Sequence, residues 1–166
     1  MNMNVEALHQ MIRVLTEVEN DPKLLPSFNL NYWNADPFDS NWTKSLDDLD
    51  AGQLSSLSIV ADCGTSACAC GFAALDPWFR DKGFRFVRDS RGSEIRFYPD
   101  LTKDLYYADW AAVREFFNLN NYESRRLFST MQYKDRETER IIPAGIIRPL
   151  HVIKRIEQLI GPEGAV

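Results

Sequence analysis

Histidine is scarce in this chain, which has only His9 and His151 among its 166 residues. The two are far apart in the sequence, and neither belongs to a motif that would place it beside a nucleophile or a metal ion. The chain also has no Walker A motif, no G-x-G-x-x-G, no H-E-x-x-H and no G-x-S-x-G. The sequence therefore gives no support for catalysis, and we lean towards a protein that is not an enzyme.

A long apolar run is missing as well. No stretch approaches the ~20 residues of a membrane span, and Glu6 and His9 interrupt the first residues, where a signal peptide would carry an apolar core. The net charge of −5 lacks the basic excess expected of a general nucleic-acid-binding protein. These absences predict a cytoplasmic protein (in the host cell, if phage-encoded) without a membrane association and with nucleic acid disfavoured as a partner.

What is present predicts a single domain over residues 1–166 of the α+β class, mostly helical. The signals for helix ends are Asn4, Thr65, Asp76 before Pro77, the capping box of Asn120 and Glu123, and Pro149. Together with apolar residues at three- and four-residue spacing, they predict about five helices. These cover residues 4–20, 65–77, 108–119, 120–131 and 149–160. Residues 84–98 alternate apolar and polar side chains around the turn sequence DSRG, which predicts one β-hairpin or a small antiparallel sheet packed on the helices.

Two segments interrupt this pattern. Residues 20–62 are rich in aromatic side chains without a helical or strand period, and predict a long ordered loop or insertion. Residues 131–166 predict a C-terminal helical addition. From residue 34 to 62 the loop carries aspartates and a single lysine, which indicates either a solvated loop or an acidic face for a basic partner. The acidic candidates for partner binding are Asp36, Asp39, Asp47, Asp48 and Asp50.

All three cysteines of the chain, Cys63, Cys68 and Cys70, fall within eight residues. A zinc site needs ligands that converge on one point, whereas positions 68 and 70 of a helix over 65–77 would point about 200° apart. A catalytic thiol would need a base and a group to orient it. A Cys63–Cys68 disulfide is geometrically possible across the start of the helix. We favour a fourth interpretation, in which the thiols are small apolar residues in a tight interface, so that serine at position 68 or 70 would cost stability.

Basic residues concentrate around the hairpin, interleaved with Phe and Tyr. Arginine beside aromatic rings on a sheet is able to stack bases and follow phosphates. The alternative is a solvated strand face with cross-strand Arg–Glu pairs, for example to Glu94. A protein partner could use the same side chains. The candidates are Arg85, Arg88, Arg91 and Arg96.

The segment "CGTSACACG" at residues 63–71 resembles the C-G-T-x-x-C-x-x-G element of a family of small hypothetical proteins from bacteria and their phages. An F-[ND]-[ML]-x-x-W element precedes it there and is matched here by "FNLNYW" at 28–33. The helices "ADWAAVREFFNL" and "YESRRLFS" follow in the same order. The resemblance implies a scaffold of an N-terminal helix, an aromatic corner, a small-residue helix, a hairpin and paired helices, but it implies no particular activity.

Three functions follow as hypotheses. The first is a non-enzymatic accessory protein of phage or mobile-element type that binds a host or phage protein, for example as an inhibitor of a defence or nucleic-acid-processing factor. The second is a redox- or metal-dependent protein that uses Cys63, Cys68 and Cys70. The third is nucleic-acid binding through the hairpin over residues 80–98. The sequence predicts no cofactor.

Overall fold

The computed structural model describes residues 2–30, 68–89, 92–130, 133–134, 140–143 and 146–161. Over these residues the chain forms six α-helices and one three-stranded antiparallel sheet, which confirms the mostly helical α+β class. The helices are α1 (Val5–Asn20), the 3₁₀ helix η1 (Leu25–Ser27), α4 (Ala69–Leu75), α5 (Pro77–Asp81), α6 (Asp109–Phe117), α7 (Asn121–Phe128) and α8 (Pro149–Ile160). The strands are β1 (Phe84–Asp89), β2 (Gly92–Phe97) and β3 (Tyr107–Ala108).

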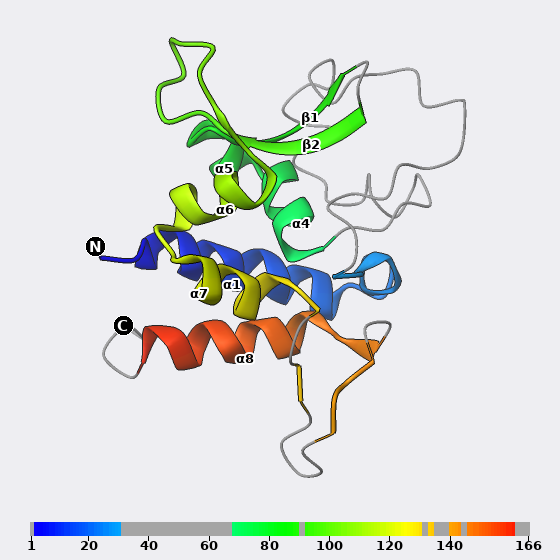
Figure 1. Ribbon diagram of the computed structural model, residues 1–166. Coiled ribbons are helices and arrows are strands. Elements are labelled where there is room, and N and C mark those ends of the chain that lie inside the picture. Colours follow the sequence, from blue (N-terminus) through cyan, green and yellow to red (C-terminus); the bar gives the residue numbers. More distant parts are fainter. Residues whose placement is uncertain are drawn as a thin grey trace.

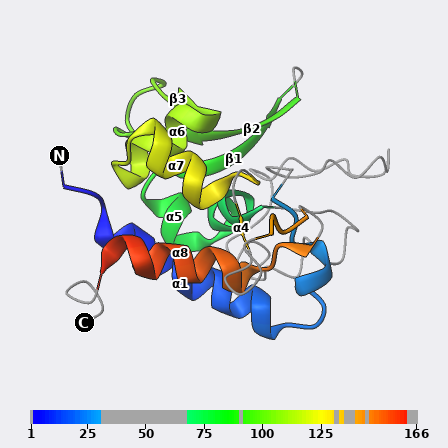
Figure 2. The same cartoon turned by 60° about the horizontal axis from the view of Figure 1, so that its bottom comes forward.

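Helix α1 lies across the middle of the molecule. The sheet lies on one side of it, with α4, α5 and α6 between, and α8 packs against its other side in the opposite direction (Figure 1). Helix α7 bridges α6 and α8, as the turned view also shows (Figure 2). The N-terminal helix and the C-terminal helix are therefore neighbours, although nearly the whole sequence separates them.

The predicted apolar stripe of α1 is confirmed. Because α4, α6 and α8 pack against this helix, four of the five predicted residues are fully buried, which are Leu8, Met11, Leu15 and Val18. Ile12 is only partly buried, and the structure adds Ala7 and Val14 to the stripe. The predicted cap is also present, since the side chain of Asn4 accepts a hydrogen bond from the N–H of Ala7 at 3.1 Å. The backbone N–H of Asn4 donates to the carbonyl of Phe117 at 2.9 Å, so the first turn of α1 is tied to the end of α6.

Helix α4 begins later than the sequence predicts. The structure starts it at Ala69 with Cys68 as its N-cap, whereas the sequence favoured a helix already formed by residue 65. All seven residues of the helix are buried, because α1 packs on one side and β1 on the other. Alanine, cysteine and glycine are the side chains that leave room for such close neighbours.

Asp76 ends α4, as predicted, and also begins α5, which the sequence analysis missed. Its side chain accepts a hydrogen bond from the N–H of Trp78 at 3.0 Å, so the same residue that stops one helix caps the next. Both carboxylate oxygens of Asp76 accept hydrogen bonds from Arg13 at 2.8 Å. Both bonds come from one nitrogen, Nη2, and this ion pair fastens the junction of α4 and α5 to the middle of α1.

The predicted hairpin is confirmed, and a short third strand extends it. Strands β1 and β2 pair with Phe86 opposite Ile95, and β2 pairs with β3. Phe84 and Ile95 turn inwards and are fully buried, so the hairpin rests on the helices, as its stability in water requires. There Phe84 meets Phe116 of α6 with their ring centroids 4.8 Å apart.

The last two helices begin where the sequence predicts. Asn120 and Glu123 form the predicted capping box at the start of α7. Helix α8 begins at Pro149, and Glu19 of α1 lies at that end, where its carboxylate pairs with Arg148 and accepts a hydrogen bond from the N–H of Leu150 at 3.3 Å. Most of the predicted loop over 20–62, and much of the connection that leads to α8, lie outside the described residues.

We expect Asp76→Ala to lower the free energy of unfolding by about 2–3 kcal/mol, because it removes an N-cap and a charged hydrogen-bonded pair together. Asp100→Ala is the matched control, since Asp100 is an aspartate that caps an exposed turn and pairs with the exposed Lys103. Urea unfolding followed by circular dichroism measures both. A loss at position 76 no larger than the loss at position 100 would contradict this role for Asp76.

Candidate functional site

Several candidates from the sequence lie outside the described residues. These are Cys63, Arg91 and the five aspartates of the predicted acidic face, and the side chain of Arg88 is not described either. The structure places Cys68, Cys70, Arg85 and Arg96. It therefore tests two of the three cysteines and two of the four basic candidates, and leaves the acidic face a prediction.

Cys68 and Cys70 do not point apart, contrary to the sequence prediction. Because Cys68 is the N-cap and not a helical residue, its side chain folds back over the first turn and reaches the thiol of Cys70 within hydrogen-bonding range. The N–H of Gly71 donates to the sulfur of Cys68 at 3.4 Å. Both side chains are buried, with at most 1% of either exposed, so the expectation that they fill a tight interface is confirmed for these two residues.

The two thiols have different acidities. Burial alone would raise the pKa of Cys68, but the hydrogen bonds from Cys70 and Gly71 outweigh it and lower the pKa. Burial, with the neighbouring Cys68, holds the pKa of Cys70 well above its usual value. Over the described residues, no three His, Cys, Asp or Glu side chains gather as a metal site would require. Histidine does not contribute here: His151 lies at the start of α8, where its Nδ1 accepts from the N–H of Arg148 at 2.8 Å.

The outer face of the sheet carries Arg85 and Arg96, which lie directly opposite each other in the register. Like charges in such positions repel, and each arginine is held by other groups. Arg85 donates to the carbonyl of Arg80 at 3.1 Å. Arg96 pairs with Glu94 of its own strand, and Glu94 lies opposite Val87 in the register. The cross-strand Arg–Glu alternative stays a prediction, because the side chains of Arg88 and Arg91 are not described.

Arg96 is the centre of a polar and aromatic cluster. Its guanidinium lies 4.2 Å from the ring centroid of Tyr106 and 3.4 Å from the hydroxyl of Tyr98. The rings of Tyr98 and Tyr106 are themselves 5.4 Å apart. Burial opposes the charge of Arg96, but Tyr98 and Glu94 more than compensate for it and raise its pKa. These contacts hold the segment that follows β2 against the outer face of the sheet.

We call residues 98–107, which connect β2 to β3, the aromatic arm. It projects from the sheet as a loop on the side away from α1 (Figure 1). Four of its large apolar side chains are exposed, whereas the described residues of 141–150 expose three, which are Ile141, Ile146 and Leu150. They are Leu101 at 52%, Leu105 at 71%, Tyr106 at 41% and Tyr107 at 42%.

Local bonds hold the aromatic arm in place. At its start, the N–H of Tyr98 donates to the carbonyl of Gly83 at 2.9 Å. Gly83 has a φ of +88°, and a Cβ there would lie 2.3 Å from the carbonyl oxygen of Tyr98, so only glycine fits this approach. Beyond it, Asp100 accepts hydrogen bonds from the N–H and the hydroxyl of Thr102 at 3.0 and 2.6 Å. At its end, Tyr107 pairs with Phe97 in the sheet.

Asp109 follows the arm at the start of α6 and is strained. It adopts a φ of +50°, which is uncommon for a residue with a side chain. Its Oδ1 atom is buried and has no hydrogen-bond partner in the described part of the chain. Burial is the main cause that raises the pKa of Asp109, and the charge of Glu94 adds to it, while the N–H of Ile95 opposes it.

The chain matches no protein-family model, no curated protein and no solved structure that it was compared with. In the part of the chain that the structure describes, every helix is too short or too polar to cross a membrane. The site must therefore be argued from the geometry alone.

We expect the two cysteines to respond oppositely to the same substitutions. At position 68, serine should equal or exceed the stability of the wild type because its hydroxyl is a better N-cap, while alanine should cost about 1 kcal/mol. At position 70, alanine should be tolerated better than serine, because burying a hydroxyl in place of a thiol costs about 1–3 kcal/mol. Urea unfolding of the four variants measures this. A serine variant at position 68 that is less stable than the alanine variant would show that Cys68 is not a cap.

The raised pKa of Asp109 predicts a pH effect with a definite sign. A carboxyl group whose folded pKa exceeds its unfolded pKa contributes stability below the unfolded pKa, and that contribution is lost as the pH rises through the folded pKa. Asp109→Asn removes the titration. We therefore expect this variant, relative to the wild type, to be more stable at pH 7 than at pH 3, as measured by urea unfolding at both values. A larger relative stability at pH 3 would contradict the direction of the shift.

Proposed function

We propose that the chain is a binding protein without catalytic activity of its own, and that the aromatic arm inserts into an apolar cleft of a protein partner. The observation that carries this proposal is the exposure of Leu101, Leu105, Tyr106 and Tyr107 on one short segment. Scattered apolar residues on a surface need no explanation, but a concentration of them is typical of an interaction site.

The kinds of side chain support a protein partner. Tyrosine and arginine are enriched in protein interfaces and dominate their energetic hot spots. Here Tyr106 is stacked on Arg96 and Tyr107 is stacked on Phe97, with ring centroids 6.4 Å apart, so the two tyrosines have little rotational freedom left to lose. Because the arm is also held at Gly83 and Asp100, binding would order few groups, which favours affinity.

The charge of the arm supports protein over nucleic acid. A surface for phosphates needs uncompensated Lys and Arg. The charge of Arg96 is paired with Glu94, and that of Lys103 with Asp100, at 3.3 Å between Nζ and Oδ2. The arm therefore offers phosphates no concentrated positive charge, and hydrophobic contact is the main attraction it provides.

The buried thiols do not favour the redox- or metal-dependent alternative. Cys68 and Cys70 each lie inside the core, where a substrate or an oxidant has no access. The resemblance to accessory proteins of bacteria and phages suggests where a partner should be sought: among proteins of the host cytoplasm, including defence and nucleic-acid-processing factors.

Site-specific photo-crosslinking in cells that carry the gene naturally tests the proposal. A photoreactive phenylalanine analogue placed at Leu105 should form a defined adduct with one protein. Adding Tyr107→Ser to the same chain should reduce that adduct at least about tenfold, since a tyrosine hot spot contributes about 2 kcal/mol or more.

The matched control is the same analogue at Ile146, which is also exposed, at 62%, but belongs to the segment before α8. It should not form the adduct. Equal adducts from positions 105 and 146, or an adduct that Tyr107→Ser leaves unchanged, would contradict a role for the arm. A salt-sensitive complex with DNA or RNA that is lost in Arg96→Gln would favour the nucleic-acid alternative instead.

A further inference from the structure

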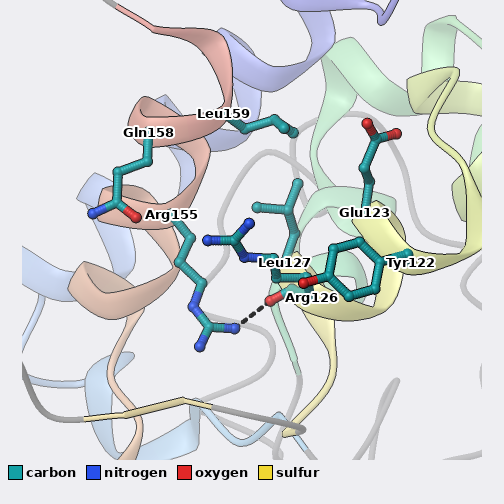
Figure 3. A pocket seen from close by; sticks show the side chains of 7 residues that line it. All are labelled: Tyr122, Glu123, Arg126, Leu127, Arg155, Gln158 and Leu159. Carbon is teal, nitrogen blue, oxygen red and sulfur yellow. Dashed lines mark hydrogen bonds between the residues drawn. The ribbon is translucent and has the colours of Figure 1, made fainter. Parts of the chain in front are cut away.

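A pocket of about 140 Å³ opens between α7 and α8, on a part of the molecule distinct from the aromatic arm (Figure 3). Helix α7 contributes four of its residues and α8 contributes three. They are Tyr122, Glu123, Arg126, Leu127, Arg155, Gln158 and Leu159. The set combines two guanidinium groups with two leucines, a tyrosine and an amide.

Arg155 is held in position at the mouth of this pocket. One of its nitrogens donates to the backbone carbonyl of Arg126, the bond that is dashed in Figure 3. Its guanidinium also lies 3.5 Å from the ring centroid of Tyr133. Burial, and then the positive charge of Arg126, lower the pKa of Arg155, although the neighbouring tyrosines counteract them. Two positive charges that lie close enough to repel each other attract an anion to the space between or beside them.

Arg126 supplies the second cation. Its guanidinium extends into the space between α7 and α8 (Figure 3), and no carboxylate in the described residues forms an ion pair with it. Glu123 also lines the pocket, but its carboxylate accepts a hydrogen bond from the N–H of Asn120 at 2.9 Å and points away from Arg126. The acidic side chain nearest in sequence is therefore committed to the capping box.

The rest of the lining consists of Leu127, Leu159, the ring of Tyr122 and the amide of Gln158. Leu127 is buried, and its side chain points towards Leu159 across the two helices (Figure 3). The ring of Tyr122 forms a side wall. A cavity of roughly 150 Å³ lined by apolar groups is large enough for a benzene ring, whereas drug-sized ligands and cofactors need about 300 Å³ or more.

We propose that this pocket binds a small organic carboxylate with an apolar body of about one ring. Its carboxylate would pair with the guanidinium of Arg126, with the charge of Arg155 beside it, and its body would lie against Leu159 and the ring of Tyr122. A planar guanidinium matches a carboxylate in shape as well as in charge. An inorganic anion has no apolar body, so it would leave the apolar part of the lining in contact with water. This inference is independent of the partner proposed for the aromatic arm.

Benzoate is the probe for this site. In an NMR titration of the ¹⁵N-labelled full chain at constant ionic strength, benzoate should shift the amide signals of α7 and α8 in a saturable way. Benzamide has nearly the same shape but no charge, and should bind about tenfold more weakly, because it lacks a charge-assisted hydrogen bond. Inorganic phosphate should bind more weakly than benzoate.

Arg126→Gln should weaken benzoate binding about tenfold. Arg125→Gln is the matched control: it changes the neighbouring arginine on α7, which lies over the ring of Trp110 and not in the pocket, and should leave binding unchanged. Amide spectra of both variants without ligand report whether the fold is kept. The assignment would be overturned by shifts that do not saturate, by equal binding of benzamide, by tighter binding of phosphate, or by benzoate binding that Arg126→Gln does not change.

Discussion

Helix α4 has no face in contact with water, because α1 covers one side of it and the first strand the other. Two elements approach a helix this closely only if its side chains are small, and here they include three alanines, a cysteine and a glycine. The ion pair of Asp76 with Arg13 then fixes the far end of α4 on α1. The sheet, and with it the aromatic arm, takes its place relative to α1 through this buried segment together with α5 and α6, which also pack against the strands.

The close packing around α4 explains why Cys68 and Cys70 act as packing residues, and why the candidate binding surfaces lie elsewhere in the molecule. Cys68 and Cys70 are where they are because they are small, and the hydrogen bond from the N–H of Gly71 turns one of them into a cap. The two candidate binding sites, the aromatic arm and the pocket between α7 and α8, lie at the surface. The arm projects beyond the sheet (Figure 1), and the pocket opens between α7 and α8.

The sequence predicts a helix end correctly where the residues beside that end determine it. Asn4, the Asn120–Glu123 capping box and Pro149 each satisfy or pre-set the backbone beside them, and each was placed correctly. The start of α4 was misplaced because Thr65 is a better cap than cysteine by intrinsic preference, whereas the choice of Cys68 depends on burial. The arm and the pocket could not be predicted, since exposure and convergence depend on how distant elements pack.

The rate at which Cys68 and Cys70 react with a thiol reagent in the folded protein tests the central claim most directly. Peptide mass spectrometry resolves these two residues from Cys63 at increasing urea concentrations. If both belong to the core around α4, they should react only through global unfolding, with the free energy and urea dependence that circular dichroism gives. Reaction of either one in the absence of urea at the rate of a free thiol would show that α4 is accessible, and would contradict the account.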